Sequence, residues 1–165
     1  MIAHSLHRLS LLVVFCLAQA LVFNRIHIFN CATPLAYVYF AIIMPRGYPK
    51  WASLLWAFFM GLSVDAFNNT PGLASASMTL VAALQPYLLE LFLPRDAEEN
   101  IEASMKSLGG GNFAMLSTAL VLVYCLTFFT LEAFSFFNWL HWLACVVGSV
   151  LLTLVMVFTF ESVRK

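Results

Sequence analysis

The sequence GLSVDAFNNTPG, residues 61–72, joins two long apolar runs and places one carboxylate, Asp65, near the end of the first run. In the centre of a lipid bilayer an aspartate costs roughly 2.5–3.5 kcal/mol, and the cost falls near the interface. Some other group must offset this cost. The Pro71-Gly72 pair predicts a turn between two membrane helices, so Asp65 is expected close to that turn.

The composition predicts a protein embedded in lipid. Hydrophobic residues make up 62% of the 165 residues and charged residues 10%, and the mean hydropathy is +0.91. A soluble domain of this length carries about a quarter charged residues. We therefore expect an all-α integral membrane protein with a single domain over residues 1–165. The formal net charge of zero gives no basis for binding nucleic acid.

Six apolar runs predict six transmembrane helices, over residues 9–28, 28–44, 51–67, 73–93, 113–134 and 139–160. A span needs about 20 residues, which the last three runs supply and the first three barely reach. A cleaved signal peptide is the alternative for the first run, because Ala18-Gln19-Ala20 fits a cleavage site. The chain continues apolar beyond Ala20, so an uncleaved helix is the preferred interpretation.

The basic residues predict the orientation. With six spans and a cytoplasmic N-terminus, only Arg25 falls outside, and seven basic residues fall inside: Arg8, Arg46, Lys50, Arg95, Lys106, Arg164 and Lys165. The positive-inside rule then places both termini in the cytoplasm.

Three charged residues belong to a predicted polar cluster on the outer side, which also includes His27, Asn68, Asn69, Asn138 and His141. Asp65 lies about 22 Å along the helix from Lys50 at 1.5 Å per residue, near the outer boundary. Glu132 ends the fifth span on that side, and Arg25 follows the first. An Arg25 ion pair with Asp65 or Glu132, a partner-docking surface, and a pocket for a small ligand are the three interpretations. No nucleophile, metal-ligand set or glycine-rich loop accompanies the cluster, so we expect no enzyme, cofactor or metal.

Small residues predict which helix faces are buried. The third span carries Ser53, Ala57, Gly61 and Asp65 at four-residue spacing, which allows close approach of another helix. Similar rows are Gly72, Ser75 or Ala76, Thr79 and Ala83 in the fourth span, and Cys145, Ser149 and Thr153 in the sixth. In the fourth span Gln85 is expected to satisfy part of the backbone that Pro86 leaves without a partner.

The longest loop, residues 94–111, is predicted to be cytoplasmic and to hold a short amphipathic helix. Asp96 and Glu99 resemble a capping pair, and Ile101, Met105 and Leu108 share an apolar face. The opposite face is acidic, which fits a solvated lid or a protein contact. The four cysteines are spaced singly and predict small buried side chains rather than disulfides or a metal site.

Taken together, these elements resemble the MreD family of bacterial rod shape-determining proteins. The similarity lies in Gly61, Asp65 and Pro71-Gly72 between the third and fourth spans, in the six spans within 165 residues, and in the long loop with the later FFTLEAF, residues 128–134, as in Bacteroidetes-type members. The resemblance implies a non-enzymatic component of the cell-elongation machinery that binds MreC and, through it, MreB and the RodA–transpeptidase pair. It also implies that Asp65 and the Pro71-Gly72 turn shape or form the partner surface.

The family is similar in architecture to the substrate-binding S components of energy-coupling-factor vitamin transporters, which gives the alternative function. That fold would place six helices around an outward-facing cavity. Trp139, His141 and Trp142 would suit a vitamin site, whereas the first helix lacks the Ala-x-x-x-Ala docking pattern of S components.

Overall fold

The computed structural model describes residues 2–21, 34–93, 101–134 and 138–164. These residues form seven helices and no strand, so the all-α prediction is confirmed. The helices are α1 Ile2–Leu21, α2 Val38–Ile42, α3 Lys50–Asn68, α4 Leu73–Phe92, α5 Met105–Leu108, α6 Gly110–Ala133 and α7 Trp139–Arg164.

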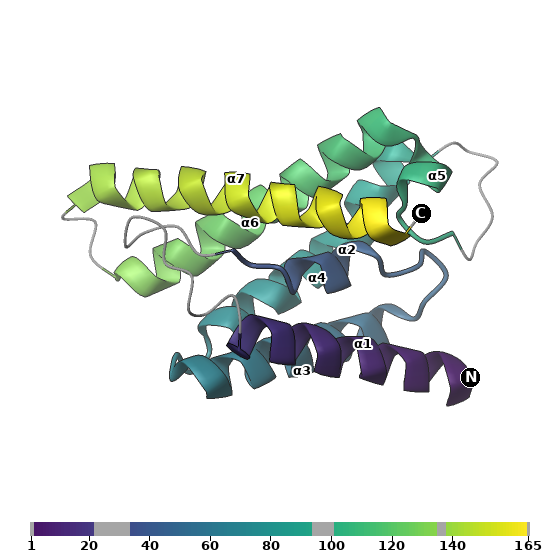
Figure 1. The fold of residues 1–165 in the computed structure, drawn as a ribbon, viewed down its shortest axis with the longest axis horizontal. Coiled ribbons are helices and arrows are strands. Elements are labelled where there is room, and N and C mark those ends of the chain that lie inside the picture. Colours follow the sequence, from purple (N-terminus) through teal and green to yellow (C-terminus); the bar gives the residue numbers. More distant parts are fainter. Residues whose placement is uncertain (1, 22–33, 94–100, 135–137, 165) are drawn as a thin grey trace.

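The five long helices form a bundle, and both termini lie at the same end of it (Figure 1). The short helix α5 lies at this end too, whereas the α3–α4 turn and the end of α6 lie at the opposite end. We call the first the basic end, because it holds the start of α1 with Arg8, the start of α3 with Lys50, and the end of α7 with Arg164. We call the second the hairpin end.

Four of the predicted spans agree closely with long helices: 51–67 with α3, 73–93 with α4, 113–134 with α6, and 139–160 with α7. The first span begins earlier than predicted, at Ile2, and its predicted residues 22–28 lie outside the described part. By length and hydropathy, α6 and α7 are the two described helices suited to cross a membrane. Polar residues such as Asp65 on α3 and Gln85 on α4 lower the hydropathy of those helices. Two such helices, and not six, are therefore supported on this criterion.

The prediction of a transmembrane helix over residues 28–44 is wrong for its described part. Residues 34–44, which we call the core segment, contain only the five-residue helix α2, flanked by turns. Residues 35–42 are each at most 3% exposed, and α2 contacts α1, α3, α4 and α6. The apolar run marks the centre of the bundle, because its side chains meet protein on every side rather than lipid.

The most extensive contact between helices is that of α3 with α4. Ser53, Ala57, Gly61 and Asp65 are all buried, so the predicted small-residue face of α3 is confirmed. A Cβ atom on Gly61 would lie 2.4 Å from Cα and 2.6 Å from the backbone N of Ser75. Only glycine therefore permits this crossing.

The predicted small-residue face is confirmed on α7 but not on α4. On α7, Cys145, Ser149 and Thr153 are buried as predicted. On α4 the buried face is rotated relative to the prediction, because Ala82 and Gln85 are buried whereas Ala83 is exposed.

Candidate functional site

Asp65 joins the end of α3 to the start of α4. Asn69 adopts the left-handed conformation (φ 55°) that ends α3, and its N–H donates to the Asp65 carbonyl. The Asp65 carboxylate accepts hydrogen bonds from the backbone N–H groups of Ala74 and Ser75, both at 2.9 Å, and from the Thr70 hydroxyl at 3.2 Å. The first amides of a helix have no partner within the helix and carry partial positive charge. These amides offset the burial of Asp65, which is 4% exposed.

The other residues predicted to surround Asp65 lie in different settings. Pro71 and Gly72 are exposed in the turn, and Gly72 precedes α4 with φ of 90°. Glu132 is exposed near the end of α6 and, within the described ranges, shares no hydrogen bond or ion pair with Asp65. Arg25 lies outside the described residues, so its predicted ion pair remains a prediction. The structure brings together Gly61, Asp65 and the turn, and it leaves Glu132 apart from them.

Buried polar side chains satisfy the backbone of the core segment. The Gln19 amide donates to the Pro34 carbonyl at 3.0 Å, and the Leu35 N–H donates to the Thr153 hydroxyl at 3.2 Å. The Gln85 amide donates to the Met44 carbonyl at 2.9 Å. Non-helical backbone in an apolar interior requires such partners, because no water is there to supply them. The expectation that Gln85 serves the Pro86 interruption is therefore wrong, since its amide serves the core segment instead.

Two tyrosines of the core segment, Tyr37 and Tyr39, form side-chain hydrogen bonds with neighbouring helices. Tyr37 and Tyr124 of α6 share a short hydroxyl–hydroxyl hydrogen bond, and both side chains are fully buried. Their rings meet edge to face at 5.7 Å between centroids. Two residues further along, the Tyr39 hydroxyl donates to Glu161 of α7 at 2.7 Å. The segment is thus attached to α6 and α7 by side-chain hydrogen bonds at defined positions.

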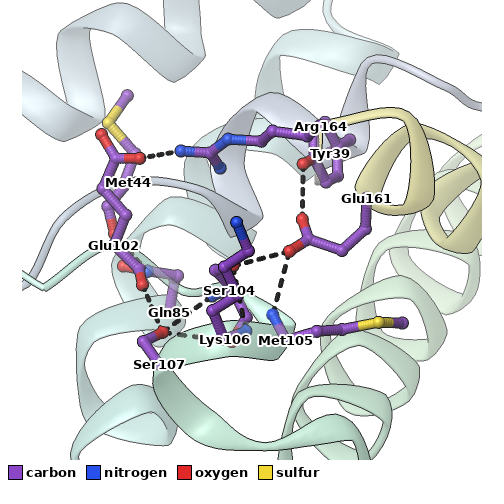
Figure 2. A network of polar contacts seen from close by, with 10 residues as sticks. All are labelled: Tyr39, Met44, Gln85, Glu102, Ser104, Met105, Lys106, Ser107, Glu161 and Arg164. Carbon is purple, nitrogen blue, oxygen red and sulfur yellow. Dashed lines mark hydrogen bonds and ion pairs between the residues drawn. The ribbon is translucent and has the colours of Figure 1, made fainter.

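Glu161 is the centre of a buried network near the basic end (Figure 2). Only 2% of this residue is exposed. Besides the bond from Tyr39, its carboxylate accepts hydrogen bonds from the Ser104 hydroxyl at 2.7 Å and the Met105 N–H at 2.9 Å. An ion pair between Glu102 and Arg164 lies beside it. These contacts fasten the end of the long loop to α7.

The loop helix is shorter than the sequence predicts. It comprises the four residues of α5, and Ser104 caps it by accepting a hydrogen bond from the Lys106 N–H at 3.2 Å. The predicted capping pair, Asp96 and Glu99, lies outside the described residues. Gly109, with φ of 82°, ends α5, and the next residue already belongs to α6.

A cavity of about 370 Å³ lies at the basic end, between α1, the core segment and the end of α7. Its floor includes Phe15, Tyr39 and Phe160, whose ring centroids lie 5.4–5.9 Å apart. Arg8 lines it and stacks on Tyr48, with the guanidinium carbon 3.5 Å from the ring centroid. Among the described residues, the buried Nη1 of Arg8 has no hydrogen-bond partner.

The sequence interpretation did not identify Glu161 or the cavity. A signal for Glu161 existed, because it is a carboxylate directly after the last apolar run, as Asp65 is near the end of the third. The role of Arg8 had no such signal, because basic residues at this end are expected from orientation alone. In the described part of the chain, no group of three or more His, Cys, Asp or Glu side chains is placed to hold a metal ion.

Comparison with known proteins identifies no relative: no protein-family model matches the chain, and searches of curated proteins and of solved structures find no match.

Proposed function

We propose that this chain is a multi-pass protein of the bacterial inner membrane and a non-catalytic scaffold of the cell-elongation machinery. In this role it binds an MreC-like protein and, through it, connects MreB to RodA and its transpeptidase. The observation that carries the proposal is the set of contacts made by Asp65. Its carboxylate accepts hydrogen bonds from backbone N–H groups at the start of α4, and these bonds hold the α3–α4 hairpin together with the Pro71-Gly72 turn exposed at its surface.

Exposed apolar side chains support the multi-pass membrane placement. All five long helices carry them: Leu17 and Leu21 on α1, Phe59 and Phe67 on α3, Leu84 and Leu91 on α4, Met115 and Leu122 on α6, and Val147, Leu151 and Val155 on α7. Soluble monomers rarely expose so much contiguous apolar surface. α1 ends at the hairpin end, α3 begins at the basic end, and both termini lie at the basic end (Figure 1). This arrangement is compatible with the proposed multi-pass placement with both termini in the cytoplasm.

The vitamin-transporter alternative finds less support. An S component needs an outward-facing cavity, yet the core segment fills the centre of the bundle and Asp65 has its hydrogen bonds within the hairpin. The cavity described above lies at the basic end, which is the cytoplasmic side in the proposed orientation. The contacts of Asp65 therefore favour a scaffold.

Co-purification from the native membrane in mild detergent tests the proposal. We expect MreC-like and RodA-like proteins to be recovered with the full chain, identified by mass spectrometry. Recovery of a transporter membrane subunit with two ATPases instead would overturn the scaffold role in favour of the alternative.

A surface variant locates the partner contact. Pro71→Glu places a charge on the exposed hairpin turn without touching the Asp65 hydrogen bonds, so we expect recovery of the MreC-like protein to fall about tenfold or more. Pro49→Glu is the matched control, because Pro49 is exposed at the start of α3 at the opposite end. Equal recovery with both variants would place the partner contact elsewhere.

A further inference from the structure

The cavity at the basic end holds a cation whose hydrogen-bonding capacity is not used. Arg8 rests one face of its guanidinium on Tyr48, and its buried Nη1 has no acceptor within the described ranges. Arg164 and Glu102 also line the cavity and form an ion pair with each other, so their charges offset. Leaving a buried charged donor unsatisfied is costly. Arg8 is therefore the guanidinium in the cavity lining that has no carboxylate partner among the described residues.

The other polar residues that line the cavity are His7, Tyr39 and the paired Glu102 and Arg164. The rest of the lining is apolar: Leu11, Phe15, Phe40, Ile43, Met44, Pro45, Phe160 and Val163. Val163 is 82% exposed, so the cavity reaches the outer surface of α7, where acyl chains would lie. Its volume of about 370 Å³ falls within the range of about 300–1,000 Å³ that small-molecule sites occupy. A largely apolar space with one guanidinium that is not paired with a carboxylate, that of Arg8, fits an amphiphile better than a free, fully hydrated anion.

We infer that this cavity binds an anionic phospholipid, with the lipid phosphate at Arg8 and the first part of an acyl chain against Phe15 and Phe160. The guanidinium presents donors whose geometry matches phosphate oxygens. Basic pockets between membrane helices on the cytoplasmic side characteristically take anionic headgroups. The inference rests on the membrane placement proposed above and is independent of the cell-elongation role.

Lipid titration of the purified full chain, read by native mass spectrometry, tests the site. The probes are phosphatidylglycerol, phosphatidylcholine with the same acyl chains, and glycerol phosphate. We expect phosphatidylglycerol to bind about tenfold or more tightly than phosphatidylcholine, because the choline ammonium of phosphatidylcholine offsets the phosphate charge and repels Arg8. Arg8→Gln should abolish this preference, whereas Arg46→Gln, at the same end but outside the cavity lining, should retain it.

A second pair of variants tests the apolar walls. Leu11→Trp fills the cavity and should reduce phosphatidylglycerol binding about tenfold, whereas Leu9→Trp, on the exposed face of α1, should leave it unchanged.

Equal binding of both lipids by the wild-type chain, or a preference that survives Arg8→Gln, would overturn the inference. So would displacement of the lipid by glycerol phosphate at comparable concentration, which would indicate a site for a small anion. Failure here would leave recovery of the MreC-like partner unaffected, so the two proposals are tested separately.

Discussion

At the scale of single residues, Asp65 shows how a charge becomes tolerable inside an apolar bundle. Its carboxylate receives two backbone amides and one hydroxyl, all from residues five to ten positions further along the chain. No cation is needed, because the free amides at the start of α4 supply the compensating partial charge. Asp65 is therefore a structural residue that positions the exposed turn.

Asp65→Ala should destabilise the protein by about 2–3 kcal/mol, because two buried amides lose a charged acceptor. We expect a melting temperature roughly 5–10 °C lower in detergent. Glu132→Ala is the matched control and should change stability by less than about 0.5 kcal/mol, since Glu132 is exposed. Equal melting temperatures for the two variants would contradict the capping role of Asp65.

Glu161 shows the same principle with different donors. Two hydroxyls and one backbone N–H surround its carboxylate, and they come from the core segment and from the start of α5 (Figure 2). One buried side chain thereby connects three parts of the chain that lie far apart in sequence. Such a residue defines how the loop and α7 fit together.

At the scale of elements, the α3–α4 hairpin is the most closely packed unit of the bundle. Gly61 allows the backbone of α3 to contact the backbone of α4 at Ser75. In the proposed membrane setting, lipid provides no hydrophobic force between helices, so close backbone contact and polar bonds hold them together. The hairpin has both, through Gly61 and Asp65.

Gly61→Ala tests this packing. The added methyl group would meet backbone atoms of Ser75 at 2.4–2.6 Å, which cannot move without separating the helices, so we expect a loss of about 1–3 kcal/mol. Gly111→Ala is the control, because a Cβ atom there has nothing within 4 Å and alanine favours the helix α6. The check is a comparison of melting temperatures, and a Gly61→Ala protein as stable as Gly111→Ala would contradict the close contact.

For the core segment, hydropathy predicts a transmembrane helix, whereas the structure shows a buried segment with one short helix. Its side chains are as apolar as those of a transmembrane helix, yet only five residues are helical and all of residues 35–42 are buried. Gln19, Gln85 and Thr153 supply the hydrogen bonds that its turns cannot make for themselves. Polar residues inside three different apolar helices thus have one common explanation.

At the scale of the whole molecule, the bundle gathers basic residues at one end. Arg8, Lys50 and Arg164 lie at the basic end, together with the carboxylates of Glu102 and Glu161, whereas Asp65 and Glu132 lie at the hairpin end. The positive-inside rule counts basic residues, so this arrangement fits the proposed orientation with the basic end in the cytoplasm. Both termini lie at that end, as the proposed even number of crossings requires (Figure 1).

Cysteine labelling measures this orientation. With a membrane-impermeant maleimide on spheroplasts, we expect Pro71→Cys to be labelled and Pro49→Cys to be labelled only after lysis, because the two positions are exposed at opposite ends. The wild-type chain controls for its own cysteines, of which Cys16, Cys125 and Cys145 are buried. The reverse labelling pattern would invert the proposed topology.

The sequence by itself determined the helical class, four of the long helices to within a few residues, and the buried face of α3. Those features follow from hydropathy, helix periodicity and the Pro71-Gly72 turn, which act over neighbouring residues. Only the tertiary structure decided that residues 35–42 are core rather than span, that Asp65 caps α4, that Glu161 binds the core segment and the start of α5, and that Arg8 lines a cavity. Those outcomes depend on contacts such as Leu35 with Thr153 and Tyr39 with Glu161, which join residues more than a hundred positions apart. Periodicity along one segment carries no information about such partners.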